Sequence, residues 1–239
     1  MLNMLAVLRK ELRAYFVSPV AYVVIAAYLV MSGVFFAILL LAQPGTAEAS
    51  LGIVFNNVAV ILLIVAPALT MRLLAEEQKS GTIELLLTSP IQDWEVVIGK
   101  YLASLVLFLV PVLMTLVYPL ILMRYGTPDV GPMLGGYIGM ILFGAAFLAV
   151  GMLATSLTQN QVIAAVVSIT VLLGLWLTGA FASSARPPVS TVLNYLSIIT
   201  HYGEFARGLI DTRDVVYYLS VIAISLFLSV RALETRRWI

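Results

Sequence analysis

Six long apolar runs, separated by short polar stretches, are the feature that most constrains the fold of this 239-residue chain. The runs cover residues 20–41, 51–71, 96–123, 133–157, 162–181 and 214–233. About 20 apolar residues in a helix are enough to cross the hydrocarbon core of a bilayer. Hydrophobic residues make up 62% of the sequence, against roughly 45–50% in soluble domains. We therefore expect an all-α integral membrane protein, with six transmembrane helices in a single transmembrane domain over residues 1–239.

The stretch before the first span, residues 1–17, has leucines at helical spacing. Its cations lie largely off that stripe: Arg9, Lys10 and Arg13. This pattern predicts an interfacial helix that lies along the membrane surface. The apolar run that follows is too long for the core of a cleavable signal, so we expect the segment to stay attached.

Two internal features of the spans predict how they bend and pack. Pro111 and Pro119 fall within the third span, which we expect to be bent because proline cannot continue the helical hydrogen bonds. Gly135 and Gly139 form a G-x-x-x-G pattern in the fourth span, which permits close approach of another helix. Packing within the chain and a seam between two chains are both compatible with this pattern.

A polar island over residues 72–100 lies between the apolar parts of the second and third spans, and its charges cannot lie in hydrocarbon. Ser80 and Gly81 should end the helix that arrives from the membrane. Residues 82–88 then predict a short amphipathic helix, with one charged residue off its apolar stripe. Next, Ser89 reads as an N-cap, with proline at the first helical position and Gln92 as the capping-box residue. A short helix of this kind at the membrane surface is suited to docking of a cytoplasmic protein. The alternative interpretation is an ordinary interfacial loop helix without a docking role.

The run over residues 76–100 reads E-E-x-x-S-G-T-I-E-x-L-L-x-S-P, followed by V-I-G-K. It resembles the cytoplasmic loop of ABC type-2 permeases, the membrane subunits of exporters driven by a separate ATPase. The resemblance implies that residues 72–95 are a cytoplasmic coupling loop. The ATPase-coupling residues it implies are Glu76, Glu77, Gly81, Thr82, Ile83, Glu84, Leu86, Leu87 and Pro90. It also implies that the interfacial helix helps to form the docking surface, whereas anchoring alone is the other interpretation.

Residues 183–213 break the pattern of spans, because the apolar stretch 189–199 is only about half as long as a crossing. We expect a re-entrant or interfacial helical hairpin before the last span. Type-2 permeases carry such a hairpin on their outer face. Its polar candidates are His201, Gly203, Glu204 and Arg207. His201 has no evident set of fellow metal ligands, and Glu204, Arg207, Asp211, Arg213 and Asp214 are interpreted as a solvated outer rim.

The last part of the chain carries two further motifs, G-L-I-D-x-R-D-V-V-Y-Y-L-S at 208–220 and A-L-E-x-R-R-W at 232–238. They resemble the permease subunit of gliding-motility-associated ABC transporters, and the layout agrees along the whole chain.

Charge asymmetry predicts the orientation. One side would hold nine of the 13 Lys and Arg residues: Arg9, Lys10, Arg13, Arg72, Lys79, Lys100, Arg231, Arg236 and Arg237. The other would hold Arg124, Arg186, Arg207 and Arg213. The positive-inside rule then places both termini and the coupling loop in the cytoplasm and the hairpin outside. We expect a multi-pass protein of a bacterial or archaeal inner membrane.

The sequence lacks the phosphate-binding motif G-x-x-x-x-G-K-[ST], so we expect this chain not to bind ATP in that way. We also expect no cofactor site, no metal site and no catalytic residue in it. ATP and Mg would be bound by partner subunits. No ionisable residue lies in the middle of a span, which disfavours an ion-coupled carrier. A net charge of +1 gives no reason to expect nucleic acid as a partner.

The expected function is the permease subunit of an ATP-driven ABC transporter that exports substrate from the cytoplasm or inner membrane. Since each chain has one coupling helix and ABC ATPases work in pairs, the expected partners are two ATPase subunits and a second permease chain, identical or related. Membrane lipid and an accessory periplasmic or extracellular protein complete the expected partners. A non-transporting scaffold or motility anchor, and an ion-coupled carrier, are the alternative functions.

Overall fold

The computed structural model describes residues 2–42, 51–82, 91–126 and 128–236. Within that part of the chain all regular structure is helical, as the sequence predicts. The helices are α1 (Leu2–Val17), α2 (Pro19–Ala42), α3 (Gly52–Thr70), α4 (Ala75–Lys79), α6 (Asp93–Met114), α7 (Val117–Tyr125), α8 (Val130–Leu157), α9 (Gln161–Ser184), α10 (Val189–Leu196), α11 (Ile198–Ala206) and α12 (Thr212–Arg236).

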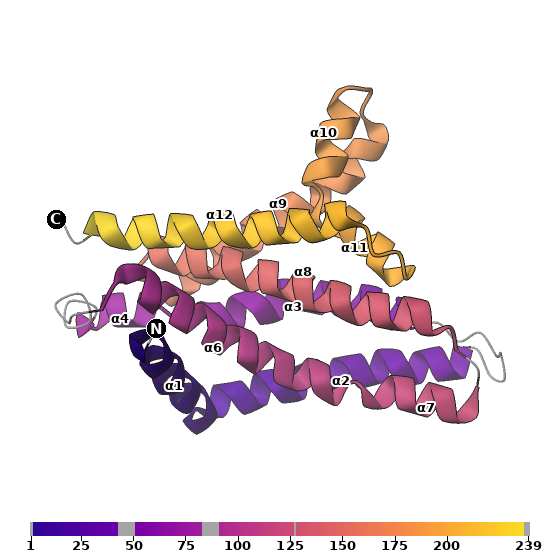
Figure 1. Cartoon of the computed structure of the whole chain (residues 1–239), viewed down its shortest axis with the longest axis horizontal. Helices are drawn as coiled ribbons and strands as arrows, with labels where there is room; N and C mark the ends of the chain where they lie inside the picture. The colour runs from indigo at the N-terminus through magenta and orange to yellow at the C-terminus, as the bar shows by residue number, and fades with distance from the viewer. Residues whose placement is uncertain (1, 43–50, 83–90, 127, 237–239) are drawn as a thin grey trace.

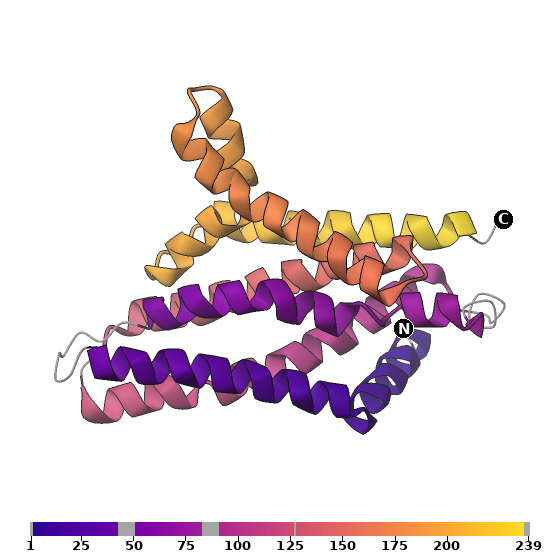
Figure 2. The same ribbon diagram turned by 180° about the vertical axis from the view of Figure 1, so that it is seen from behind.

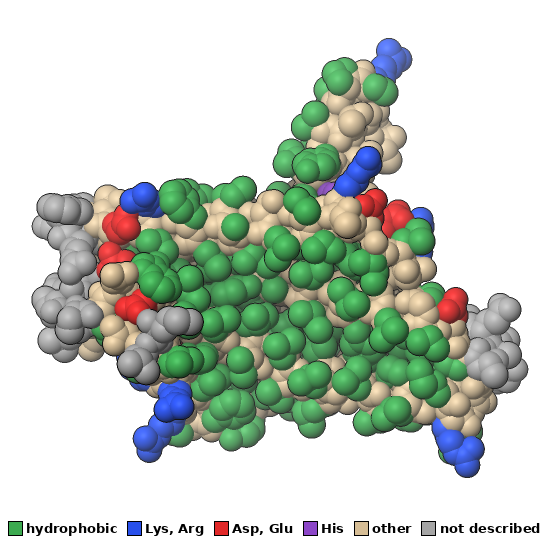
Figure 3. Space-filling model, viewed as in Figure 1, with side chains coloured by type: hydrophobic (Ala, Val, Ile, Leu, Met, Phe, Trp, Pro, Cys, Tyr) green, Lys and Arg blue, Asp and Glu red, His purple; other side chains and the backbone are tan. Residues whose placement is uncertain are grey.

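Six helical stretches in the described residues are long and apolar enough to cross a membrane, which confirms the six predicted spans. They run Pro19–Leu41, Gly52–Lys79, Asp93–Tyr125, Val130–Leu157, Gln161–Ser184 and Thr212–Thr235. The spans lie side by side, and both termini are at the same end of the bundle (Figure 1). On the face seen in Figure 3, apolar side chains cover the middle of the bundle and charged side chains gather toward the two ends. We call the end with the termini the terminal end and the opposite one the hairpin end.

Helix α8 forms the centre of the bundle and packs against α3, α6, α9, α11 and α12. Glycines let large side chains lie directly against its backbone: a Cβ on Gly144 would lie 2.3 Å from the ring of Phe108, and one on Gly139 would lie 2.4 Å from Cβ of Phe205. Phe205 belongs to α11, and a Cβ on Gly135 would lie 2.7 Å from its carbonyl oxygen. The G-x-x-x-G pattern therefore packs within the chain, which was one of its two interpretations.

The predicted bend of the third span is confirmed, because α6 ends at Met114 and α7 begins at Val117. Pro119 has no N–H to donate to the carbonyl of Thr115, four residues earlier. That carbonyl instead accepts hydrogen bonds from the backbone N–H of Tyr118 (2.9 Å) and from the hydroxyl of Tyr137 on α8 (2.8 Å). The lost helical bond is thus replaced by a contact that fixes the bend against the central helix.

The predicted start of the helix after the polar island was wrong in register. Ser89 and Pro90 lie outside the described residues, but Ile91 and Gln92 are not helical, and Gln92 is itself the N-cap of α6. Its backbone N–H donates to the carboxylate of Glu95 at 3.3 Å, which closes a capping box one turn later than expected. Acidic residues in the first turn favour this start, because they face the positive end of the helix dipole.

The segment predicted as a hairpin before the last span forms two short helices, α10 and α11, joined at Ser197, of which α10 packs against α9 and α11 against α8. Both views show α10 standing out sideways from the bundle, whereas α11 lies against it (Figures 1 and 2). Re-entry of this hairpin into the membrane stays a prediction, as does the position of α1 along the membrane surface.

Candidate functional site

The described part of the polar island begins with a break between α3 and α4, and one threonine of the central helix holds it. The hydroxyl of Thr155 accepts hydrogen bonds from the backbone N–H groups of Ala75 (3.0 Å) and Leu74 (3.4 Å). It donates to the carbonyl of Met71 at 3.2 Å. The amide of Gln78 donates to the carbonyl of Ser156 at 3.3 Å. Helix α8 therefore fixes the direction in which α4 leaves the bundle.

Four charged side chains from three helices meet beside α4, and we call them the ionic cluster: Lys10, Glu11, Glu77 and Lys100. Nζ of Lys100 lies 2.7 Å from Oε1 of Glu11 and 3.0 Å from Oε2 of Glu77. Nζ of Lys10 lies 3.0 Å from Oε1 of Glu77. The side chain of Lys100 is only 2% exposed. The cluster thus joins α1, α4 and α6 at the terminal end of the bundle.

The charges of the ionic cluster are matched, with two ammonium groups and two carboxylates. A buried lysine at the end of an apolar span is costly unless it is paired, and here two carboxylates share it. The contact with Oε2 of Glu77 is an ion pair without hydrogen-bond alignment. Partial burial lowers the pKa of Lys10, but its hydrogen bond to Glu77 and the charges of Glu77 and Glu11 outweigh burial and raise that pKa above its ordinary value. Lys10 is therefore charged at neutral pH.

Close backbone packing brings α1 to α6 next to this cluster. A Cβ on Gly99 would lie 3.0 Å from the carbonyl oxygen of Met4 and 3.0 Å from Cβ of Val7. Glycine at this position lets α1 lie against α6 and places Glu11 beside Lys100. The three predicted docking cations Arg9, Lys10 and Arg13 are all exposed, and of the three Lys10 also joins the ionic cluster.

The helix break predicted at Ser80 and Gly81 is confirmed. Helix α4 ends at Lys79, and Gly81 has φ +72°, in the left-handed region that favours glycine. The hydroxyls of Ser80 and Thr82 lie 2.8 Å apart, and both residues are exposed. Five residues of the implied coupling set lie outside the described part of the chain: Ile83, Glu84, Leu86, Leu87 and Pro90.

The structure gives different surroundings to the two glutamates of the implied coupling set. Glu76 is exposed, whereas Glu77 points into the ionic cluster. Sequence reasoning missed Glu11, Lys100 and Thr155 as the residues that position this segment. A lysine eight positions into a helix that continues as a span was the available signal, because such a charge needs a partner.

At the hairpin end, His201 and Asp214 form a buried pair. Nδ1 of His201 lies 2.6 Å from Oδ1 of Asp214, and Nε2 lies 3.0 Å from the carbonyl oxygen of Tyr195. Both ring nitrogens thus face oxygens. A carbonyl only accepts, so Nε2 donates to Tyr195. Nδ1 then either donates to the carboxylate of Asp214 or accepts from its protonated carboxyl group. The interpretation of Asp214 as part of a solvated rim was wrong, because the packing of α11 on α12 buries it.

Tyrosine hydroxyls attach the hairpin to the bundle. Tyr217 and Tyr218 of α12 donate to the carbonyls of Leu196 and Ile198, each at 2.8 Å. Tyr202 of α11 donates to the carbonyl of Phe55 on α3 at 3.2 Å. Buried tyrosines need such partners. Leu196 is the last residue of α10, where carbonyls have no helical donor, whereas Ile198 and Phe55 lie near helix starts and accept the tyrosine as a second donor. The other polar candidates fit a rim: Gly203 and Glu204 are half-buried, and Arg207 is exposed.

Together these observations define a helical membrane protein with six spans, a polar loop clamped at the terminal end and a helical hairpin tied down at the other. The family model described as ABC-2 family transporter protein matches residues 5–238, and the chain belongs to that family. Over 157 residues the chain is 26% identical to the protein named "Probable multidrug ABC transporter permease YbhR" in Escherichia coli K12, and equally to the protein of that name in Escherichia coli O157:H7. The match covers 65% of this chain and 42% of each relative.

Proposed function

We propose that this chain is the membrane-spanning subunit of an ATP-driven exporter whose ATP is bound and hydrolysed by separate subunits. The observation that carries the proposal is the family match, which covers residues 5–238. Two such chains, identical or related, would pair with two ATPase subunits that hold ATP and Mg. Both termini and the loop between α4 and α6 would lie in the cytoplasm, and the hairpin outside.

The terminal end has the construction that a coupling site requires. A force on the loop after α4 reaches α1 and α6 through the ionic cluster and reaches α8 through Thr155. Ionic and hydrogen-bonded contacts of this kind have defined geometry, so a displacement of the loop moves the spans rather than the loop alone. The paired charges make α4 a rigid arm between the ATPase and the bundle.

The cargo we propose for the chain is drug-like molecules, because the Escherichia coli relative is named as a probable multidrug transporter permease. A second candidate is a permease of a gliding-motility-associated transporter. The motifs at 208–220 and 232–238 favour it through their resemblance to that family.

The proposal is tested at Glu84, the ionised residue within the predicted coupling helix 82–88. If its carboxylate meets an arginine or backbone donors on the ATPase, Glu84→Ala should weaken docking by about 1–3 kcal/mol, the usual scale for a hydrogen bond to a charged group. Glu84→Lys should weaken docking further, because it reverses the charge in a fitted contact. The measurement is recovery of the ATPase by pull-down, together with permease-dependent ATP hydrolysis, at equal membrane expression.

The matched control is Glu204→Lys, which makes the same charge change at the hairpin end. That variant should retain ATPase recovery and hydrolysis at the wild-type level. A glutamate that only stabilises a helix end is worth about 0.3–1 kcal/mol and would leave ATPase recovery almost unchanged. Wild-type recovery and hydrolysis in Glu84→Lys would therefore contradict the assignment of this residue to coupling.

A further inference from the structure

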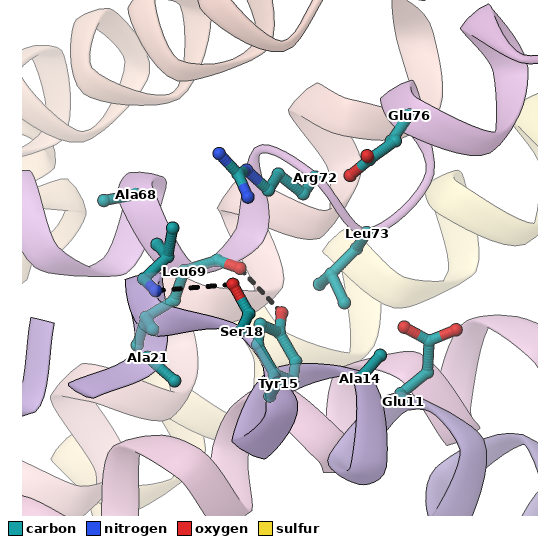
Figure 4. A pocket seen from close by; sticks show the side chains of 11 residues that line it. Glu11, Ala14, Tyr15, Ser18, Ala21, Ala68, Leu69, Arg72, Leu73 and Glu76 are labelled. Atoms are coloured by element: carbon teal, nitrogen blue, oxygen red, sulfur yellow. Dashed lines mark hydrogen bonds between the residues drawn. The ribbon is translucent and has the colours of Figure 1, made fainter. Parts of the chain in front are cut away.

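A pocket of about 270 Å³ opens at the terminal end between α1, the start of α2, the end of α3 and α4. Figure 4 shows Arg72 and Glu76 on the side of α3 and α4, with Glu11 on the side of α1. Ala68, Leu69 and Leu73 contribute apolar surface to the same pocket. The pocket therefore combines an apolar wall with charges of both signs.

Two opposite charges at this pocket are held apart. Arg72 and Glu76 are both exposed, and neither forms an ion pair with any residue in the described part of the chain. Of the nearby hydroxyls, Tyr15 donates to the carbonyl of Leu69 at 2.7 Å, whereas Ser18 accepts from the backbone N–H of Val20 at 3.3 Å and keeps its own proton to donate. The charged groups free for recognition in this pocket are the guanidinium of Arg72 and the carboxylate of Glu76. A guanidinium suits a phosphate, and a carboxylate suits an ammonium group.

The position of the pocket indicates an amphiphile rather than a soluble ligand. It lies where one span begins, at Pro19, and the next ends, near Thr70, which is the level of lipid headgroups in a bilayer. Helices α2 and α3 run side by side from this level (Figure 2). From Ala68 an apolar stripe continues along α3 at four-residue spacing, through Ile64 (68% exposed) and Val60 (51% exposed). This stripe gives an acyl chain a continuous apolar surface that leads away from the charged residues of the pocket.

We propose that this pocket binds a phospholipid whose headgroup carries a phosphate and a primary ammonium group, the chemistry of phosphatidylethanolamine. Arg72 binds the phosphate, Glu76 accepts from the ammonium group, and an acyl chain lies along Ile64 and Val60. The lipid comes from the leaflet on the side of the termini. Because Arg72 lies in the break between α3 and α4 and Glu76 lies in α4, the lipid contacts the segment that also carries Glu77 of the ionic cluster.

The test is lipid binding to the full-length chain, purified with any co-purifying subunits, stripped of lipid in detergent and titrated while bound lipid is measured by native mass spectrometry. Wild type should bind phosphatidylethanolamine more tightly than phosphatidylglycerol, which lacks the ammonium group. Arg72→Gln should weaken binding of both lipids about tenfold, the scale of one charged hydrogen bond, and Arg72→Lys should recover part of it. Glu76→Gln should remove the preference between the lipids. The control Arg13→Gln changes an exposed cation of α1 outside the pocket and should bind like wild type.

Three results would overturn the proposal. Unchanged phosphatidylethanolamine binding in Arg72→Gln would show that the pocket does not hold the phosphate. Equally tight binding of soluble phosphoethanolamine would show that the acyl chain adds nothing, so that the ligand is not a lipid. Loss of the co-purified ATPase in Arg72→Gln, with lipid binding intact, would make the pocket a protein-docking surface. If only the proposed transport function were wrong, the lipid titration would still give the results expected here.

Discussion

Lys100→Met should lower the free energy of unfolding by about 3–5 kcal/mol, the usual cost of breaking a buried ion pair from one side. Nζ of Lys100 lies 2.7 Å from Glu11 and 3.0 Å from Glu77, and its side chain is 2% exposed. Methionine fills a similar volume, so the loss comes from the charge. Two carboxylates that share one ammonium group would be left facing each other, with only the exposed Lys10 to offset them. Unfolding in detergent by heat or denaturant would measure the loss.

A compensated variant separates charge from packing. Lys100→Met combined with Glu11→Gln and Glu77→Gln leaves no unpaired carboxylate at this position and should recover most of the lost stability. Lys79→Met changes an exposed lysine near the same end and should stay within about 0.5 kcal/mol of wild type. If Lys100→Met were as stable as wild type, the ionic cluster would not hold α1 and α4 on the bundle. The proposed transmission of force through it would then fail.

Gly139→Leu should destabilise the protein by about 1–3 kcal/mol, the usual cost of overpacking, and release α11 from α8. A Cβ at this position would lie 2.4 Å from Cβ of Phe205, which is too close for either backbone to stay in place. The expected sign of release is faster thiol labelling of a cysteine that replaces buried Ser197 at the hairpin joint. Stability and labelling rate would be measured together.

Gly174→Leu is the matched control, because no described residue has an atom within 4 Å of a Cβ there. It makes the same change in another span, and its stability and labelling rate should equal those of wild type. Adding Phe205→Ala to Gly139→Leu should restore docking in part, since the smaller side chain leaves room for the new one. Equal labelling in Gly139→Leu and Gly174→Leu would contradict the close packing of α11 on α8.

The spans were predictable because a bilayer demands long apolar helices, and this constraint acts on each stretch of sequence by itself. The breaks at Gly81 and Pro119 were predictable for the same local reason. The ionic cluster was not, because Glu11, Glu77 and Lys100 are distant in sequence and periodicity does not pair them. The start of α6 was misplaced because two capping patterns overlap, one from Ser89 and one from Gln92, and only the second has the acidic residue that closes it.

The hairpin end shows the same division between local and tertiary information. The short length of 189–199 predicted that this segment does not cross the membrane as a full span, and α10 and α11 are indeed short. The burial of Asp214 depends on His201, which reaches it only after α11 folds back onto α12. Asp214 belongs to a stretch with several charges, so its sequence context alone indicates solvent.

The proposed coupling requires contact between the ATPase and the loop after α4, and one cross-linking measurement tests that contact. A photo-reactive residue would replace Thr82, which is exposed at the exit from α4, or Thr191, which is exposed in the hairpin. After illumination of intact cells, the account predicts that Thr82 cross-links to an ATP-binding subunit and that Thr191 does not. A cross-link from Thr191 to that subunit, or none from Thr82 in an assembled complex, would contradict it.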